Sequence, residues 1–498
     1  MSLTNQLKNQ HLLWRAGFGP AVEQLDDLSK FTPKQFFKAL VKAAEKKPEY
    51  IDVADDYLKG LMMGIDEVGR MQKKEMDKDE RKMVQQKNRE GVRNLNIFWM
   101  HQMVNTSSQL REKLAFFWHG HFACRNLNVF YQQGLLDTIR TNALGNFGTL
   151  LKEVSKSAAM LNFLNNQQNK KDHPNENFAR EVMELFTLGR GNYTEHDVKE
   201  AARSFTGWGA NIKGEFQFRR FQHDAGSKTV LGKTGNFDGD SVLDILLAEK
   251  QTAKFICHKM YKFFVNENID DKKVEWLADR FYKNNYEISP LLEDMFTSDW
   301  FYEEKNIGTQ IKSPVELLVG IQRILPMKLE NEEALMVLQR ILGQLLFYPP
   351  NVAGWPGGKN WIDSSSLMMR MRIPKLINNV DEMNVKPKDD DDTMMGMKDN
   401  EGQGKVNRNN SGQQKAGGAY AGMGRQQINA NVDWKTYVQH YESTEKERLT
   451  ETIAQVLLQV KSSVSTDIIK KYSDETGREN FIRTATLQVM STPEYQLC

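Results

Sequence analysis

The sequence predicts a mainly α, multi-helix globular fold, and three observations support this prediction. Apolar residues recur at three- and four-residue spacings in most segments, as in Leu114, Phe117 and Trp118, and this is the spacing of one face of a helix. The 498 residues are 40% hydrophobic and 27% charged, which is enough apolar material for two or three cores. Alternation typical of strands is confined to one short stretch, so we expect little β-structure.

The helical spacing continues along the chain. It is found in Leu185, Phe186 and Leu188, in Leu243, Leu246, Leu247 and Phe255, and in Leu317, Leu318, Ile321 and Ile324. Residues 66–104 begin with a charged stretch that has few apolar side chains and end with a denser apolar stripe that includes Trp99. We expect one long helix here, or two helices broken at Gly91, exposed in the first part and buried in the last.

A small β-hairpin is expected near residues 215–232. Polar and apolar side chains alternate over 215–221, a turn with His223 and Asp224 follows, and 229–231 returns as a partner strand. Because turns held on a rigid scaffold often carry site residues, His223 and Asp224 are candidates. The alternative is a turn whose aspartate only hydrogen-bonds its own backbone.

A change of composition divides the chain into three parts. Residues 386–431 consist largely of Asp, Gly, Asn, Gln, Lys and Met, and such a stretch buries too little apolar surface to offset its ordering entropy. We therefore expect a main helical domain over 1–385 that carries all candidate site motifs. A disordered polar linker follows over 386–431, and 432–498 is a helical C-terminal tail packing on the main domain.

Charge and cysteine content exclude several classes of protein. Lys and Arg total 67 against 65 acidic residues, a net charge of +2, so no positive field favours nucleic acid. The three cysteines form no CxxC pair, which argues against a disulfide framework and a cysteine zinc site. No apolar run has the length of a transmembrane segment or of a signal peptide, so the default expectation is a cytoplasmic protein.

Motifs of common enzyme classes are also missing. The sequence contains no GxSxG elbow, P-loop, HExxH or GxGxxG motif, which disfavours serine hydrolases, NTPases, zincins and Rossmann dehydrogenases. Any chemistry must therefore come from other groups of side chains.

The segment His119-Gly120-His121 is the first such group. On a helix, residues two apart diverge by roughly 200°, so both imidazoles face one ion only if the chain leaves its helix. Gly120 permits such a break. The alternative is that two hydrogen-bonded, inert histidines end an aromatic helix.

The segment 176–184 is the second group. Glu176, Arg180 and Glu184 follow an i, i+4, i+8 spacing, and Glu181 lies three residues before Glu184. The helix continues into the apolar stretch 185–189, so its carboxylates should be partly buried and should need partners or a metal. The alternative is a structural ion network centred on Arg180.

We expect these groups to converge in one pocket, because each alone is incomplete as a metal site. The expected ligands of a divalent metal, such as zinc, iron or manganese, are His119, His121, His223 and Asp224; the expected catalytic residues are Glu181, Glu184 and Arg180. The predicted function is a metal-dependent hydrolase or oxidoreductase. The alternative is a non-catalytic helical scaffold or interaction protein of a bacterial surface or secretion assembly.

A loop rich in proline and glycine, residues 349–358, precedes Trp361. Its two tryptophans, Trp355 and Trp361, are candidate substrate-binding residues, because aromatic faces stack on apolar ligand surfaces in carbohydrate or peptide clefts. The alternative is a structural loop that packs across helices.

Taken together, these motifs resemble a bacterial family catalogued as domain of unknown function 1800. The matching segments are His11-Leu-Leu-Trp-Arg-Ala-Gly-Phe-Gly19, Phe116-Phe-Trp-His-Gly-His-Phe122, Asn175-Glu-Asn-Phe-Ala-Arg-Glu181, Phe205-Thr-Gly-Trp208, His223-Asp224 and Pro349-Pro-Asn-Val-Ala-Gly-Trp-Pro-Gly-Gly358. The resemblance implies a mostly helical fold but no reaction. It also implies exported or surface-associated relatives and a sulfatase-like neighbour protein as a partner, although this chain has no evident signal and carries the polar insert.

Overall fold

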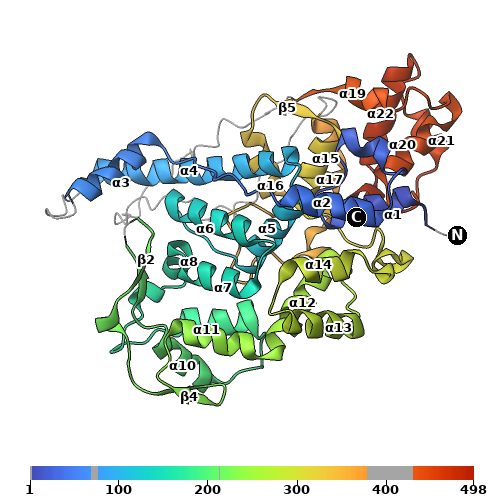
Figure 1. Cartoon of the computed structure of the whole chain (residues 1–498). Helices are drawn as coiled ribbons and strands as arrows, with labels where there is room; N and C mark the ends of the chain where they lie inside the picture. Colours follow the sequence, from blue (N-terminus) through green and yellow to red (C-terminus); the bar gives the residue numbers. More distant parts are fainter. Residues whose placement is uncertain (1–2, 69–76, 212, 378–429) are drawn as a thin grey trace, which may run out of the picture.

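The computed structural model describes residues 3–68, 77–211, 213–377 and 430–498. Most of these residues are helical, which confirms the predicted fold class, and α5 lies near the centre of the molecule (Figure 1). The first helices are α1 (Asn5–Arg15), α2 (Pro33–Ala44), α3 (Asp56–Val68), α4 (Lys78–Asn105), α5 (Gln109–His121), α6 (Val129–Asn142), α7 (Phe147–Lys156) and α8 (Ala158–Phe163). Next come α9 (Asn177–Glu181), a π-helix (Val182–Thr187), α10 (Glu195–Ser204), α11 (Gly239–Ala248), α12 (Lys250–Phe264), α13 (Asp271–Lys283) and α14 (Ile288–Phe296).

The second half of the chain completes the helical body. Its helices are α15 (Pro314–Ile324), α16 (Glu333–Ile341), α17 (Ser364–Ile377), α19 (Trp434–Gln439), α20 (Leu449–Leu457), α21 (Thr466–Lys471) and α22 (Arg478–Met490). Short 3-10 turns cover Val22–Asp27, Asn166–Gln168, Arg220–Gln222, Asp299–Tyr302, Glu304–Asn306, Gly358–Trp361, Lys446–Arg448 and Pro493–Gln496. None of the helices in the described ranges has the length and apolar character that a membrane crossing requires.

Local sequence explains where many helices begin. Thr32 accepts a hydrogen bond from the Gln35 amide, and Pro33 occupies the first position of α2. Ser313, Pro314 and Glu316 form the same arrangement at the start of α15. A capping residue satisfies an amide that has no partner inside the helix, and proline has no amide to satisfy there.

Helix α4 continues through Gly91, so of the two alternatives the break at that residue is not observed. A Cβ atom at Gly91 would lie 2.7 Å from Cγ2 of Val129, which shows that the glycine allows α6 to pack closely. The described part of α3 ends at Val68 and α4 begins at Lys78, and residues 69–76 are outside the described residues. As predicted, α4 is exposed at its start and buried at its end.

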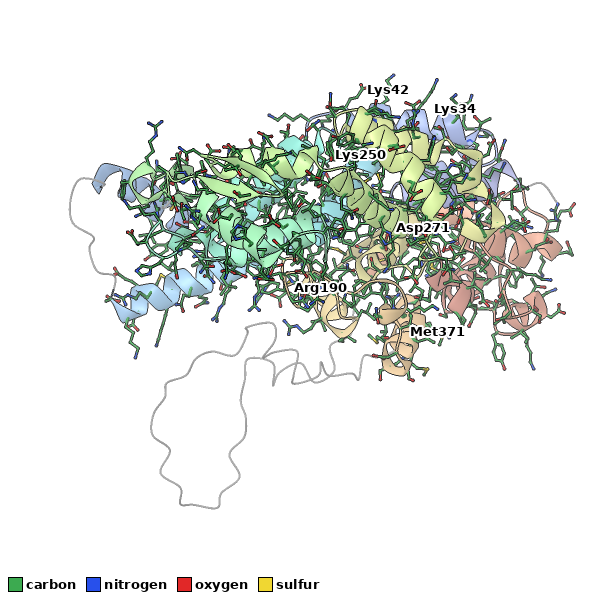
Figure 2. The ribbon with its side chains drawn as sticks, turned by 90° about the horizontal axis from the view of Figure 1, so that it is seen from below. Lys34, Lys42, Arg190, Lys250, Asp271 and Met371 are labelled. Atoms are coloured by element: carbon green, nitrogen blue, oxygen red, sulfur yellow. The ribbon has the colours of Figure 1, made fainter. Side chains whose placement is uncertain are left out.

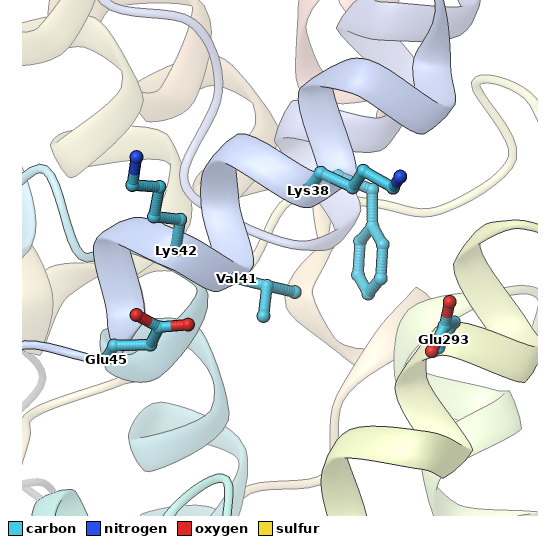
Figure 3. A pocket seen from close by; sticks show the side chains of 6 residues that line it. Lys38, Val41, Lys42, Glu45 and Glu293 are labelled. Carbon is cyan, nitrogen blue, oxygen red and sulfur yellow. The ribbon is translucent and has the colours of Figure 1, made fainter.

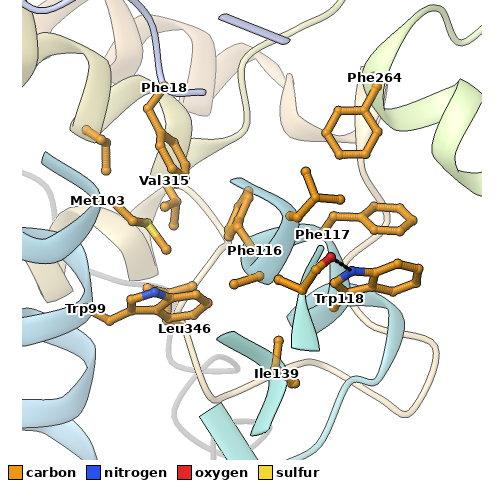
Figure 4. Close-up of a cluster of buried hydrophobic side chains, with 14 of the residues drawn as sticks. Phe18, Trp99, Met103, Phe116, Phe117, Trp118, Ile139, Phe264, Val315 and Leu346 are labelled. Atoms are coloured by element: carbon orange, nitrogen blue, oxygen red, sulfur yellow. Dashed lines mark hydrogen bonds between the residues drawn. The ribbon is translucent and has the colours of Figure 1, made fainter. Parts of the chain in front are cut away.

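The core surrounds α5. Trp99 from α4, Phe264 from α12 and Val315 from α15 gather around Phe116, Phe117 and Trp118 of α5 (Figure 4). Burial of such large apolar side chains is the main favourable term in folding. Trp118 Nε1 donates to the Ala143 carbonyl at 3.0 Å, which satisfies the polar atom of this ring.

Two buried ion pairs connect α5 to its neighbours. Glu112 binds Arg140 of α6 at 2.8 Å, and the next residue, Lys113, pairs with Glu316 of α15. Both pairs are almost fully buried, and removal of one partner would leave an uncompensated charge in the core. The orientation of α5, and therefore of the histidines at its end, is strongly constrained.

The described residues form three two-stranded antiparallel sheets, but the predicted pairing of 215–221 with 229–231 is wrong. Strand β2 (Phe216–Phe218) pairs with the preceding β1 (Trp208–Ala210), and β3 (Lys228–Val230) pairs with β4 (Lys233–Gly235). Leu231 and Gly232 both have positive φ angles, 49° and 76°. Such a two-residue turn matches the twist of a hairpin, so β3 turns back at once onto β4.

The C-terminal segment lies at one end of the molecule, where α19–α22 gather (Figure 1). Strand β6 (Ala430–Val432) pairs with β5 (Met327–Leu329), and α22 contacts α17. The predicted linker 386–431 lies outside the described residues except for Ala430 and Asn431, which belong to β6. Charged side chains such as Lys34, Lys42 and Lys250 project from the surface (Figure 2).

Candidate functional site

Helix α5 does not end at Gly120 but continues to His121. His119 and His121 therefore diverge, because residues two apart on a helix point to different sides. The condition under which both imidazoles would face one ion is not met in this structure. The two histidines have different surroundings and different partners.

His119 supports the backbone of a neighbouring loop. Its Nε2 accepts a hydrogen bond from the Phe347 amide at 3.2 Å, and its ring lies against those of Trp99, Phe347 and Trp355. Phe347 has a φ angle of 69°, a conformation that a bulky residue rarely adopts without support. Burial lowers the pKa of His119 to about 3, so this ring is neutral and acts as an acceptor.

His121 is buried, and only one of its two ring nitrogens has a hydrogen-bond partner among the described residues. Its Nε2 lies 3.2 Å from the carbonyl oxygen of Phe186, in the π-helix. A carbonyl only accepts, so Nε2 carries the proton and Nδ1 keeps a lone pair. Nδ1 is buried without a hydrogen-bond partner among the described residues. Burial, and then the nearby Lys259 ammonium, hold the pKa of His121 well below its usual range.

In the segment 176–184, Arg180 and Glu184 bind residues other than the predicted metal ligands. Arg180 binds Glu195 at 2.7 Å and Glu176 at 3.1 Å, and Glu184 accepts a hydrogen bond from the hydroxyl of Tyr193. Burial, and then the neighbouring Glu184, raise the pKa of Glu181. The partner residues Glu195 and Tyr193 were not predicted as parts of this group, because they follow it in the sequence without a fixed spacing.

His223 and Asp224 also have local partners. His223 Nδ1 lies 3.0 Å from the carbonyl oxygen of Thr206. Asp224 binds Arg203 at 2.7 Å and accepts the Gly226 amide at 2.8 Å. Arg203 is the main cause of the lowered pKa of Asp224.

The structure does not bring the predicted metal ligands together. No three His, Cys, Asp or Glu side chains in the described ranges form a group that could hold a metal ion. The reason is that α5 separates His119 from His121, while Thr206 and Arg203 hold His223 and Asp224. The divalent metal stays a prediction from the sequence.

A cavity of about 250 Å³ lies between α5, α12 and the loop 353–361, and we call it the α5–α12 cavity. His121 borders it, and so do both predicted substrate-binding residues, Trp355 and Trp361. Phe117 and Phe263 supply apolar walls. The indole Nε1 of Trp355 is buried without a hydrogen-bond partner among the described residues. An aromatic cavity with a few polar atoms is typical of a small-molecule site.

Lys259 of α12 was not predicted from the sequence as a site residue. It borders the same cavity and is partly buried, and its Nζ lies 5.4 Å from the centre of the Phe255 ring. No ion pair or hydrogen bond joins Nζ to another residue in the part of the chain described here. Burial lowers the pKa of Lys259 to about 8. Its position on the edge of the apolar face of α12, beside Met260, gave no distinctive signal, because surface lysines often lie at such edges.

The glycine-rich loop closes over one side of this cavity. Gly358 has a φ angle of 59°, and a Cβ atom there would lie 1.5 Å from an oxygen of Glu267. Only glycine can therefore occupy this position beside the carboxylate. On the same loop, a Cβ atom at Gly354 would lie 2.6 Å from the Gly120 carbonyl oxygen. The loop is thus packed against both the end of α5 and the segment after α12.

A second hollow, of about 290 Å³, lies between α2 and α14 (Figure 3). Its polar lining consists of Lys38, Lys42, Glu45 and Glu293, which are surface side chains, none of them buried. Surface charges of this kind are well solvated and need no ligand. This hollow is therefore a weaker candidate than the α5–α12 cavity.

Comparison with protein families matches residues 11–497 to the family described as "Protein of unknown function (DUF1800)". No curated protein and no solved structure matches the chain.

Proposed function

We propose that this chain, which belongs to the DUF1800 family, is an enzyme that binds a small organic substrate in the α5–α12 cavity. One observation supports this most directly: Lys259, His121 and Trp355 border the same cavity, and Lys259 Nζ, His121 Nδ1 and Trp355 Nε1 have no hydrogen-bond partner among the described residues. Unpaired buried polar groups are costly and rare in folded proteins. A bound molecule would supply the missing partners.

The lining suggests the kind of substrate. Phe117, Phe263 and Trp361 present aromatic surface, which favours an apolar body. The Trp355 indole can donate to an oxygen atom, and the lone pair of His121 Nδ1 can accept from a hydroxyl or an amine. A compact molecule with an apolar ring or chain and one oxygen-bearing head group fits both surfaces and the volume of about 250 Å³.

The chemistry we propose is proton transfer. His121 is neutral, so its Nδ1 can act as a base, while Lys259 has a pKa of about 8 and can give or take a proton close to neutral pH. Groups whose pKa values are shifted by burial in a cavity are often catalytic. The two residues come from α5 and α12, which the buried core holds together.

Gly120 allows a direct test. It borders the cavity, and a Cβ atom there would meet nothing within 4 Å, so the backbone at Gly120 accepts a side chain and Gly120→Leu should reduce the space in the cavity. Gly134 of α6 also has free space around its Cβ position but does not border the cavity, so Gly134→Leu is the matched control. Both changes favour a helix by up to about 1 kcal/mol.

Ligand-observed NMR with small aromatic aldehydes, ketones, alcohols and acids measures binding. We expect at least one of these probes to bind the unmodified protein and Gly134→Leu, and to lose binding in Gly120→Leu. If no probe binds, or if binding persists in Gly120→Leu, the cavity is not the substrate site.

The functions predicted from the sequence stay separate proposals. Zinc, iron or manganese bound through His119, His121, His223 or Asp224 would be found by elemental analysis and lost in His119→Ala plus His121→Ala with the fold intact. A catalytic role of Glu181 would require that Glu181→Gln abolish activity, and roles of Glu184 and Arg180 would be tested by substitutions at those residues. A scaffold protein, with or without a sulfatase-like partner, would show an exposed binding face and no turnover.

A further inference from the structure

The amine of Lys259 differs from the other enclosed lysine amines that the structure describes. Lys113 pairs with Glu316, Lys228 donates to the Phe237 carbonyl at 2.9 Å, and Lys312 donates to the Tyr495 carbonyl at 2.6 Å. Each of these amines has an acceptor in the protein. The Nζ of Lys259 has none among the described residues and borders a cavity instead.

The charged groups around the cavity do not neutralise Lys259. The titratable residues that border the cavity are His121 from α5, Lys259 and Lys262 from α12, Glu267 and Glu316. Glu316 is paired with Lys113, and the Glu267 carboxylate lies against Gly358. Lys262 is exposed and has the same sign of charge as Lys259. A lysine that is partly buried and has no neighbouring anion tends to lose its proton.

We infer that Lys259 is a nucleophile that takes a small aldehyde or ketone as an imine. This inference rests on the proposed function, because it assigns the substrate class of the same cavity. A carbonyl compound fits the lining, since the Trp355 indole can donate to the carbonyl oxygen while the apolar body lies against Phe117 and Trp361.

Formation of an imine at Lys259 needs no oxidant and no reductant. The neutral Nζ of Lys259 attacks the carbonyl carbon, a C–N bond forms, and the π electron pair moves to the oxygen. A proton moves from nitrogen to oxygen, which gives a carbinolamine. Protonation of that hydroxyl and loss of water then give the protonated imine, which forms the neutral imine when it releases the proton on nitrogen. Addition of water reverses the sequence. His121, whose pKa the charge of Lys259 lowers, has a free lone pair on Nδ1 that can accept a proton in transit.

The pKa of Lys259 agrees with this role. With a pKa of about 8, roughly half of the amine is neutral at pH 8, against less than about 1% for an ordinary lysine. Lower basicity also makes an amine intrinsically less nucleophilic. We therefore expect a net advantage on the order of tenfold over a surface lysine.

Reductive trapping tests the inference. The full chain is treated at pH 8 with benzaldehyde and sodium cyanoborohydride, and peptide mass mapping follows the rate at which each lysine gains a benzyl group. We expect Lys259 to react about tenfold faster than Lys262, which lies on the same helix and borders the same cavity. Lys259→Arg keeps the charge but cannot form this imine, so it should lose the fast adduct.

The outcomes separate the inference from the proposed function. If Lys259 reacts no faster than Lys262, Lys259 is not a special nucleophile, whether or not the NMR probes bind in the cavity. Fast labelling that saturates with benzaldehyde, is inhibited by benzyl alcohol and is absent in Gly120→Leu supports both. Fast labelling that neither saturates nor responds to benzyl alcohol or Gly120→Leu supports the nucleophile and overturns the cavity as the binding site.

Discussion

Two regions of this protein contain polar side chains that chemistry can use, and they differ in whether those side chains have partners. In the 176–224 region, Arg180 binds Glu176 and Glu195, and Asp224 binds Arg203. At the α5–α12 cavity, His121 Nδ1, Trp355 Nε1 and Lys259 Nζ have no partner among the described residues. The comparison teaches that density of charged residues in sequence indicates ion pairing, whereas incomplete pairing beside a cavity indicates a ligand.

The largest expected effect is on acid stability and involves both histidines of α5. The pKa of His119 is about 3 and that of His121 is well below its usual range, whereas both would lie near 6.5 in the unfolded chain. As the pH falls below about 6.5, the unfolded chain takes up protons that the folded chain does not. The free energy of unfolding should therefore fall by about 2 kcal/mol per histidine between about pH 7 and pH 5.

Urea unfolding at several pH values measures this effect. The double variant His119→Gln, His121→Gln should show a shallower loss of stability than the unmodified protein over the same range, whatever its stability at pH 7. His196→Gln, at an exposed position in the 176–224 region, is the control. An unchanged slope in the double variant would mean that these histidines are not held neutral.

The next effect concerns the loop over the cavity. Gly358→Ala combines a positive φ angle with a Cβ position that meets the Glu267 carboxylate, so we expect a cost of about 2 to 3 kcal/mol. Gly343, at the C-terminal end of α16, also has a positive φ angle, 86°, but free space around its Cβ position, so Gly343→Ala should cost only about 1 kcal/mol. Thermal unfolding compares the two variants, and equal costs would show that the loop does not press on Glu267.

A smaller effect on stability is expected in the 176–224 region, where the charged side chains form ion pairs. Arg203 binds both Glu200 and Asp224 and is about 29% exposed, so Arg203→Met should cost about 2 kcal/mol. Asp224→Asn in the same background should cost little more, because its partner is already gone. A double-mutant cycle by chemical denaturation gives the coupling between the two residues. A coupling near zero would contradict a structural role for this pair.

The smallest effect is expected at Glu181. Burial and Glu184 raise the pKa of Glu181, so its charged form is disfavoured in the folded protein at neutral pH. Glu181→Gln removes that penalty, and stability should stay within about 1 kcal/mol or rise slightly. A loss of several kcal/mol in the unfolding free energy would show that Glu181, like Glu195, neutralises Arg180.

Much of the fold was predictable because helices are encoded locally. The three- and four-residue spacing of apolar side chains predicted the fold class correctly, and the pattern of exposure predicted that α4 becomes buried along its length. Strand pairing was predicted less well. The alternating stretch did form a strand, but Leu231 and Gly232 direct β3 to β4 instead of β2.

The candidate site was predictable only in part. Its residues His121, Trp355 and Trp361 were identified from residue type and from the rigid loop around them. Lys259 was not, because one lysine on an otherwise ordinary amphipathic helix does not differ in sequence from a surface lysine. Its special property is the lack of an anion in three dimensions, which no spacing predicts.

The sequence by itself determined the helical fold class, the lack of the common catalytic motifs and several polar residues available for chemistry, but not Lys259. Only the tertiary structure decided which of those residues remain unpaired. His119 binds the Phe347 amide 228 positions away, and His121 binds the carbonyl of Phe186 65 positions away. The physical reason is that spacing sets which face of a helix a side chain occupies, whereas its partner depends on which distant segment packs against that face.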